Sequence, residues 1–276
     1  METKANDYNE VDILYTLMSY VNVSSYQDMY YTIAQTVLTH LDQIPHISIN
    51  DLADLCYTSP ATISRFCKDL NCKSFANFKR EMEIALKIAN NEIHFDDDDQ
   101  DMIENDPQTL VTKIYEDTRE SLTRGESNIS IKDIDKICEL MHESQDVHLV
   151  GYQFSKIVGT DFQLKMLKLK KFIYCFVNRG DEIQKLETIN EGDLIIILSV
   201  RARSELMDSL INKVKEKKPK ILMITMNNHY KNPLVDHFYY LSGEESDYTQ
   251  SSLMGSIAME SLLNVIYVRY GLLYQD

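Results

Sequence analysis

Apolar residues recur at intervals of three and four along residues 8–44, a spacing that predicts amphipathic helices at the start of the chain. Pro45 is expected to close the second of these helices, because proline cannot continue a helical hydrogen-bond ladder. The two apolar stripes consist of Val11, Leu14, Tyr15 and Met18, and of Ile33, Val37, Leu38 and Leu41.

Two short helices joined by a tight connection are predicted next. Ser48 is expected to cap the first of them, and Tyr57-Thr58 forms the connection. Ser59 followed by Pro60 predicts the second start, because serine is a good N-cap and proline is tolerated in the first turn. Ser74 is expected to cap a further helix. The buried faces of the pair are predicted at Ile49, Leu52, Ala53 and Cys56, and at Ile63, Phe66, Cys67 and Leu70.

From about residue 109 the pattern changes to short apolar runs separated by amphipathic segments. Such runs predict buried strands, and their alternation with helices is typical of a parallel sheet that is covered on both faces. The chain closes with a long helical segment from residue 251. The fold class is therefore an all-α N-terminal bundle followed by an α/β domain. The predicted strands are 147–151, 171–177, 193–199, 220–225 and 237–241.

The boundary between these parts is expected in an acidic segment. Residues 92–106 carry eight acidic side chains and no apolar period, and mutual repulsion disfavours their packing. We predict a helical domain over 1–91, an acidic linker over 92–108 and an α/β domain over 109–276. The end of this segment fits equally well as an acidic first turn of the next helix.

Length, charge and cysteine usage narrow the class of protein. A chain of 276 residues favours two domains. Its N-terminus lacks the pattern of a signal peptide, and no apolar run is long enough to cross a bilayer, so we expect a cytoplasmic protein without a membrane partner. The five cysteines show no CxxC pair, which indicates reduced thiols. We expect no metal site, cofactor or catalytic residue.

The formal net charge of −15 argues against nucleic acid as a partner. The distribution of the charged residues along the chain argues for it. Residues 59–88 contain six basic and three acidic side chains, and a local basic region of this kind suits phosphate contacts. Two helices, with Ala53 where they cross and Ile63 buried in the second, form the helix-turn-helix pattern. The alternative is an ordinary helical bundle with solvated basic side chains.

In that pattern the second helix lies in the major groove of double-stranded DNA. Arg65 suits bidentate contacts to guanine, whereas lysines suit phosphates, which position the protein without specifying sequence. Lys68, Lys73 and Lys79 are the predicted phosphate contacts. The outer face of the helix is predicted to comprise Ser59, Ala61, Thr62, Ser64, Arg65 and Lys68.

These residues resemble the N-terminal domain of the MurR/RpiR transcriptional regulators over about residues 30–88. Asn71 stands at the family's glycine position, and asparagine tolerates the left-handed backbone. Tyr57 stands where small residues are usual. The resemblance is carried by Ser59, Thr62, Arg65, Phe66, Lys68 and Leu70.

The resemblance implies that the second domain is a SIS domain, a Rossmann-like fold that binds a phosphosugar. Its first loop matches at Gly151 and Ser155, with Gln153 at the second glycine. Its second loop matches at Ser199 and Ser204, with Arg201 and Ala202 replacing a serine and a glycine. Such loops present N–H groups to a phosphate. Arg201 and Arg203 are candidate replacement donors, and Glu244 or Glu245 is a candidate contact to a sugar hydroxyl. His229 and His237 are expected to be loop and edge residues.

The function expected from the resemblance is sequence-specific regulation of sugar metabolism genes, controlled by a phosphosugar or related anion. Symmetric pairing as a homodimer or homotetramer implies a palindromic operator. Two alternatives stay open. One is a regulator whose SIS domain has become a ligand-free dimerisation module, which the lost glycines favour. The other is a phosphosugar isomerase, which would have no use for a helix-turn-helix.

Overall fold

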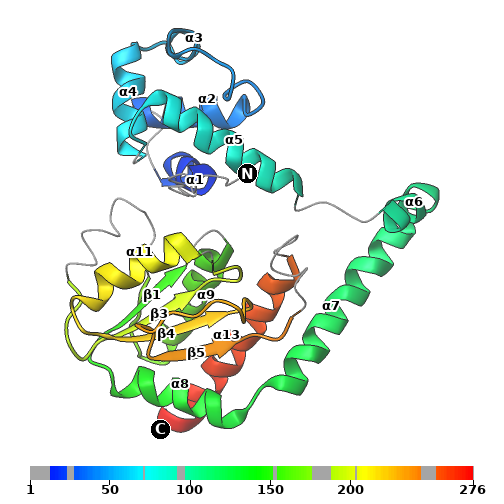
Figure 1. The fold of residues 1–276 in the computed structure, drawn as a ribbon, viewed down its shortest axis with the longest axis vertical. Helices are drawn as coiled ribbons and strands as arrows, with labels where there is room; N and C mark the ends of the chain where they lie inside the picture. The colour runs from blue at the N-terminus through cyan, green and yellow to red at the C-terminus, as the bar shows by residue number, and fades with distance from the viewer. Residues whose placement is uncertain are drawn as a thin grey trace, which may run out of the picture. The chain divides into compact units, whose positions relative to one another are not determined.

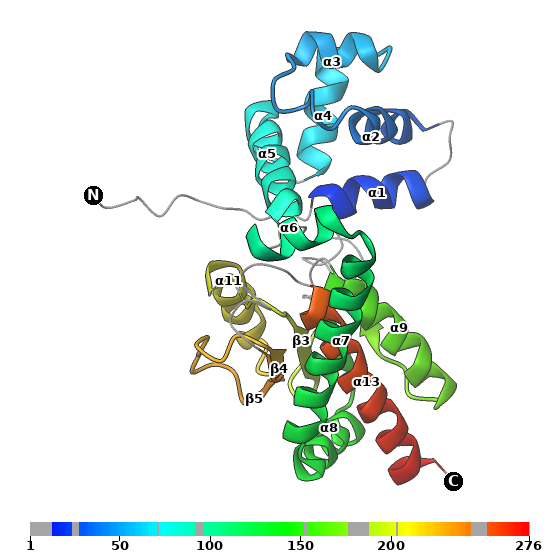
Figure 2. The same ribbon diagram turned by 90° about the vertical axis from the view of Figure 1, so that its right-hand side faces the viewer.

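The computed structural model describes residues 13–23, 28–70, 72–91, 97–151, 154–175, 188–202, 204–243 and 253–275. These residues fall into two compact units that divide near residue 90, and each unit is described by itself (Figures 1 and 2). No helix within these ranges combines the length and the apolar character needed to cross a membrane.

The first unit is a bundle of helices. Ser48 and Ser59 are N-caps, since the hydroxyl of each accepts a hydrogen bond from the backbone N–H three residues on. Ser74 Oγ accepts from the N–H of Asn77 in the same way at the start of the fifth helix. All three predicted caps are confirmed. The helices are α1 (Ile13–Val23), α2 (Met29–Thr39), α3 (Ile49–Leu55), α4 (Pro60–Asp69) and α5 (Phe75–Asn91).

One predicted boundary in this unit is wrong. The helix expected to end at Pro45 ends at Thr39, with His40 as its C-cap. The imidazole Nδ1 of His40 lies 2.8 Å from the carbonyl oxygen of Thr36, so one of the terminal carbonyls of the helix is satisfied by a side chain. Hydrogen-bonded turns then cover residues 41–46. Proline therefore follows the end of this helix rather than causing it.

The apolar stripe predicted for the first helix is wrong at Met18, which is 41% exposed, because the fully buried positions of α1 are Ile13 and Leu17, and Val11 lies outside the described residues.

The core of the first unit does confirm the apolar face predicted for α4. Ile63, Phe66, Cys67 and Leu70 are all buried. The ring of Phe66 packs against those of Tyr20 and Tyr30, with centroid distances of 5.6 and 5.1 Å. These contacts join α4 to α1 and α2. One side of α4 is thus fixed in the core, which leaves its other side facing solvent.

The second unit contains helices around a single sheet. Helix α6 lies within the segment predicted as an acidic linker, where no apolar period indicated a helix. Carboxylates in a first helical turn are favoured by the helix dipole, and Lys113 of the next helix lies 3.0 Å from Asp99. The linker and domain boundaries stay a prediction. The helices are α6 (Asp97–Asn105), α7 (Gln108–Asn128), α8 (Ile131–Glu143), α9 (Phe154–Lys168), α11 (Ser204–Lys215) and α13 (Leu253–Tyr274).

The sheet confirms the predicted α/β class. Its five strands are all parallel and run in the order β2-β1-β3-β4-β5. The predicted run 171–177 contributes only a short strand to the described residues, which stop at residue 175 there. The strands are β1 (Val147–Gly151), β2 (Tyr174–Cys175), β3 (Leu194–Leu198), β4 (Lys220–Thr225) and β5 (His237–Tyr240).

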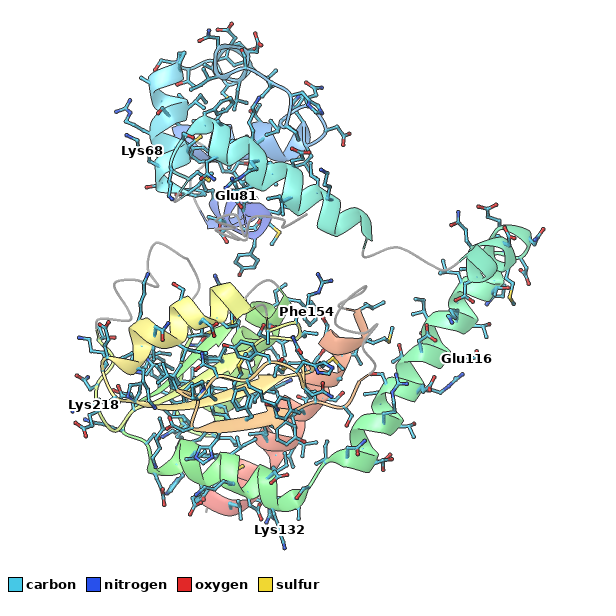
Figure 3. All side chains as sticks on the ribbon, in the orientation of Figure 1. Lys68, Glu81, Glu116, Lys132, Phe154 and Lys218 are labelled. Atoms are coloured by element: carbon cyan, nitrogen blue, oxygen red, sulfur yellow. The ribbon has the colours of Figure 1, made fainter. Side chains whose placement is uncertain are left out.

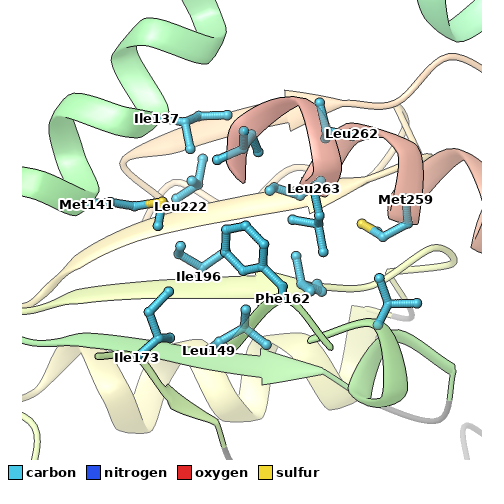
Figure 4. Close-up of a cluster of buried hydrophobic side chains, with 14 of the residues drawn as sticks. Ile137, Met141, Leu149, Phe162, Ile173, Ile196, Leu222, Met259, Leu262 and Leu263 are labelled. Atoms are coloured by element: carbon cyan, nitrogen blue, oxygen red, sulfur yellow. The ribbon is translucent and has the colours of Figure 1, made fainter. Parts of the chain in front are cut away.

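Helices cover both faces of the sheet, as its continuous apolar strands require. Alternate residues of β3 point to opposite faces: Ile196 belongs to the core beneath α8, α9 and α13, whereas Ile197 belongs to the core beneath α11. Figure 4 shows the first of these cores, where Phe162 of α9 packs among strand and α13 side chains. All five cysteines lie in the described ranges, are buried, and form no disulfide.

Candidate DNA-recognition and ligand-binding sites

The turn between α3 and α4 has the tight geometry of a helix-turn-helix. The N–H of Thr58 donates to the carbonyl oxygen of Ala53 at 2.8 Å, which closes the end of α3. Ala53 is buried where the helices meet. Tyr57 has a φ of +52° and its side chain is 92% exposed. The turn therefore requires a residue with a left-handed backbone. This requirement explains why small residues are usual at this position and why Tyr57 departs from the pattern.

The first turn of α4 links its cap to the predicted base-recognising arginine. Ser59 Oγ lies 3.0 Å from Thr62 Oγ1 and accepts from the Thr62 N–H at 3.2 Å. Arg65 Nη2 donates to Thr62 Oγ1 at 3.5 Å. Thr62 thus connects the helix cap to the guanidinium. These weak local contacts orient Arg65 while its remaining donors stay available to a partner.

The predicted contact residues of α4 share its solvent-facing side. Ala61, Arg65 and Lys68 are exposed, and Thr62 and Ser64 are partly exposed. Figure 3 shows Lys68 projecting outward from α4. At the end of the same helix, Asp69 accepts a hydrogen bond from the Tyr20 hydroxyl. Burial, reinforced by this carboxylate, raises the pKa of Tyr20. That contact fixes the end of α4 to α1.

The three lysines predicted to contact phosphates differ in their surroundings. Lys68 and Lys73 are exposed. Lys79 is half-buried, and its Nζ donates to the carbonyl oxygen of Ile47 at 3.0 Å and lies 5.8 Å from the centre of the Phe75 ring. The structure therefore gives Lys79 an internal role that the sequence did not predict: it ties α5 to the residue that precedes the Ser48 cap.

In the second unit, the carboxyl ends of β1 and β3 lie side by side. The chain leaves β1 toward α9 on one face of the sheet and leaves β3 toward α11 on the other. With the strand order β2-β1-β3-β4-β5, this position is the topological switch point, where open α/β sheets bind ligands between loops. The sheet thus brings the described parts of the two predicted ligand loops, residues 151 and 154–155 and residues 199–202 and 204, to its carboxyl end.

The first loop requires glycine at its start. A Cβ at Gly151 would lie 2.7 Å from the carbonyl carbon and oxygen of Ser155, so the first turn of α9 passes directly over this residue. Ser155 is buried in that turn. Lys156, which no sequence pattern indicated, is also buried there with 6% of its surface exposed. A buried cation at a helix N-terminus adds to the positive potential of the helix end and favours an anion.

The second loop is held by hydrogen bonds to the end of β4. The hydroxyl of Thr225 donates to the carbonyl of Val200, and Asn227 Nδ2 donates to the carbonyl of Arg201 at 2.9 Å. Ala202 adopts a φ of +42°. The backbone therefore keeps a left-handed residue at the family's glycine position although the residue is alanine. The support that Thr225 and Asn227 give to this loop was not predicted from the sequence. Their position, at and just after the carboxyl end of a predicted strand, was the signal that could have indicated it.

Several predicted ligand residues lie outside the part of the chain that the structure describes: Gln153, Arg203, Glu244 and Glu245 fall in undescribed segments, as does Asn71. Ser204 begins α11. Arg201 is partly exposed. His229 is an exposed residue after β4. His237 is the first residue of the outermost strand β5 and so lies at the amino end of the sheet, away from the two ligand loops. In the described residues, no three His, Cys, Asp or Glu side chains are grouped as metal ligands would be.

Family models match both units. The model for the helix-turn-helix domain of the rpiR family matches residues 24–91, and the model for the SIS domain matches residues 140–269. Together they span the two candidate sites.

Several relatives of this chain are transcriptional regulators. An uncharacterized HTH-type regulator of Caldanaerobacter subterraneus subsp. tengcongensis is 22% identical over 241 residues, covering 86% of this chain and 83% of that protein. The regulator RpiR of Escherichia coli K12 is 21% identical over 186 residues, covering 66% and 60%. HexR of Pseudomonas aeruginosa is 22% identical over 194 residues, covering 70% and 66%.

Solved structures share the fold. The NanR protein of Vibrio vulnificus, complexed with ManNAc-6P, has a TM-score of 0.53 at 18% identity, covering 95% of this chain and 92% of that one. A protein of Escherichia coli CFT073 in complex with A5P has a TM-score of 0.51 at 13% identity, covering 60% and 92%. At these identities the likeness establishes the fold alone.

Proposed function

Because this chain belongs to the MurR/RpiR family of transcriptional regulators, we propose that it binds a specific operator in double-stranded DNA and controls genes of sugar metabolism. The observation that carries the proposal is the solvent-facing side of α4, where Arg65 and Lys68 are exposed on a helix whose other side is buried. Such a helix suits insertion into the major groove. A protein that binds chromosomal DNA must reach it in the cytoplasm, so we propose a cytoplasmic location.

In this proposal the residues of α4 have separate tasks. Arg65, oriented by Thr62, contacts a guanine edge, and Ser59, Ala61, Thr62 and Ser64 complete the surface that faces the bases. Lys68 and Lys73 contact phosphates. Lys79 acts indirectly, by holding α5 against Ile47. The acidic remainder of the protein repels DNA elsewhere, which restricts binding to this surface.

We further propose that the carboxyl edge of the sheet binds a phosphosugar or a related anion. The switch-point position, the close approach at Gly151, the buried Lys156 and the left-handed Ala202 support an anion site. Ser155, Ser199 and Ser204 are the proposed hydroxyl contacts. Gln153, Arg201, Arg203 and Glu245 stay predictions. The phosphosugars in the complexes of NanR and the Escherichia coli protein are the first ligand class to test.

A homodimer or homotetramer is the proposed assembly, because paired recognition helices require a two-fold axis and a palindromic operator. A ligand could then change operator affinity by altering the spacing of the pair. A regulator with a ligand-free SIS domain is the nearest alternative, supported by the replaced glycines. We propose no enzymatic activity, since a phosphosugar isomerase would gain nothing from the first unit.

Selection of operator sequences from a random DNA pool tests the central proposal. The intact protein should enrich a palindromic sequence, and Arg65→Ala should lose about 1 to 3 kcal/mol of discrimination at the contacted base pair. Arg119→Ala is the matched control, since this exposed arginine lies on α7 and its loss should leave the selected sequence unchanged. Identical sequence preference in Arg65→Ala would overturn the assignment of the recognition helix.

A further inference from the structure

A cavity of about 310 Å³ lies in the second unit between α7, β5 and α13. Its walls include Leu122 of α7, Ile129 directly after that helix, Tyr239 and Leu241 at the end of β5, and Leu262 of α13. None of its lining residues belongs to the loops 151–155 and 199–204. The cavity is therefore distinct from the proposed anion site, and a ligand in one place does not require a ligand in the other.

One polar side chain in the cavity wall lacks a hydrogen-bond partner among the described residues. Ser121 is fully buried, and its hydroxyl makes no hydrogen bond. A helical serine or threonine ordinarily donates to the carbonyl four residues earlier. On the same helix Thr118, Thr123 and Ser127 do so at 2.7, 2.8 and 2.9 Å. The Ser121 hydroxyl thus departs from this pattern, and leaving it unsatisfied is costly.

The composition of the walls limits what the cavity accepts. Most of the lining is apolar, which excludes a phosphosugar because its hydroxyls and phosphate would lose their hydration without replacement partners. Glu126 stands at the exposed side of the lining, and its carboxylate repels an anion such as a fatty acid. The volume is about twice the roughly 150 Å³ cavity that takes up benzene in another protein, so a bicyclic molecule fits.

We propose that this cavity binds a small neutral molecule with an apolar body and one hydrogen-bonding group, which pairs with the Ser121 hydroxyl. The apolar body would contact α7 on one side and α13 on the other. Because a ligand that binds only the folded protein stabilises it, occupancy would strengthen the attachment of α7 to the rest of this unit.

Indole is a suitable probe, because it has an apolar bicyclic body and a single N–H group. The chain contains no tryptophan, so the fluorescence of the probe is not obscured by the protein. We expect saturable binding of indole by the intact protein, with a blue-shifted emission and a raised Tm. Ser121→Ala should weaken indole binding about threefold to tenfold. Binding of indene, which has the same shape without the N–H, should stay within twofold.

Filling the cavity provides the second arm of the test. A Cβ at Gly125 would have no neighbour within 4 Å, so Gly125→Leu extends into the cavity without a clash. Ser261→Leu fills it from α13 on the opposite wall. Both variants should abolish indole binding. Gly125→Ala is the control for the change in helix propensity, and Ser127→Ala is the control for loss of a hydroxyl outside the cavity. Both controls should bind indole as the intact protein does.

Three results would overturn the proposal. The first is the absence of indole binding. The second is binding that survives both Gly125→Leu and Ser261→Leu, since the probe would then lie elsewhere. The third is binding seen only when the oligomer dissociates, because a second copy of the chain would then occupy the cavity.

Discussion

The hydroxyl oxygen of Ser199 accepts a hydrogen bond from the backbone N–H of Ala202 at 3.0 Å, and Ala202 lies at a φ of +42°. The left-handed conformation is strained for alanine because of its Cβ, whereas glycine adopts it readily. The loop therefore preserves a glycine geometry after the glycine has been replaced. The hydrogen bond to the Ser199 hydroxyl and those donated by Thr225 and Asn227 at the end of β4 hold it in place.

Replacing Ala202 by glycine should raise the free energy of unfolding by about 0.5 to 1 kcal/mol. The relief of left-handed strain exceeds the entropy that glycine adds to the unfolded chain. Urea denaturation at equilibrium measures the change. Ala76→Gly, at an exposed position in α5, is the control and should lose about 0.5 to 1 kcal/mol. Equal losses in the two variants would contradict strain at residue 202.

Lys68 and Lys79 should respond differently to removal of their charge. Lys68→Ala should weaken DNA binding to a similar extent for all sequences and reduce the slope of log affinity against log salt by about 1. Lys79→Met should leave that slope unchanged. It should instead lower the stability of the first unit by about 1.5 kcal/mol, because the Ile47 carbonyl loses a charged donor. Titrations of operator DNA across a salt series and urea denaturation separate the two effects. A reduced salt slope in Lys79→Met would show that this lysine contacts phosphate.

Lys156→Met should weaken binding of phosphate-bearing ligands at the carboxyl edge of the sheet by about tenfold or more. The lysine is buried in the first turn of α9, and in the proposed anion site its charge would act together with the helix N-terminus on the ligand. Calorimetric titration with inorganic phosphate and a panel of phosphosugars measures the loss. Lys168→Met changes the same charge at the exposed far end of α9 and should bind as the intact protein does. Unaltered affinity in Lys156→Met would remove this residue from the site.

His148 makes the stability of the second unit depend on pH. It is buried in β1, with Nε2 3.3 Å from Asp193 Oδ2 and its ring stacked on Tyr174. Burial lowers the pKa of His148, and the nearby Asp193 carboxylate only partly opposes this effect. The folded protein therefore favours the neutral imidazole, so the unfolded chain binds the proton more readily. Stability should be full above about pH 6.5 and should fall as the pH decreases below that value.

Urea denaturation at pH 7.5 and pH 5.5 tests the role of His148. The intact protein should lose more stability between these values than His148→Gln loses. His229→Gln replaces an exposed histidine and should behave as the intact protein does. A His148→Gln variant with the full pH dependence would assign the effect to other groups.

Features that depend on neighbours along the chain could be predicted from the sequence. The caps at Ser48, Ser59 and Ser74 join atoms three residues apart, and short apolar runs located the five strands. The tight connection at Tyr57-Thr58 was likewise predicted from its position between two helices, although its left-handed backbone was not. These interactions form within one or two turns, so the local order of residues specifies them.

Features that join distant segments depend on the packing of the folded chain. Lys79 is bonded to a carbonyl 32 residues earlier, and no local pattern distinguishes it from the exposed Lys73. The burial of Lys156 and the cavity beside Ser121 depend on where β1, β5 and α13 pack. The end of α2 before Pro45 and the helix in the acidic segment were also misjudged, because a side-chain cap at His40 and an ion pair to Lys113 outweigh local propensity. Burial and partner choice are properties of the packed core, where residues far apart in sequence compete for the same space.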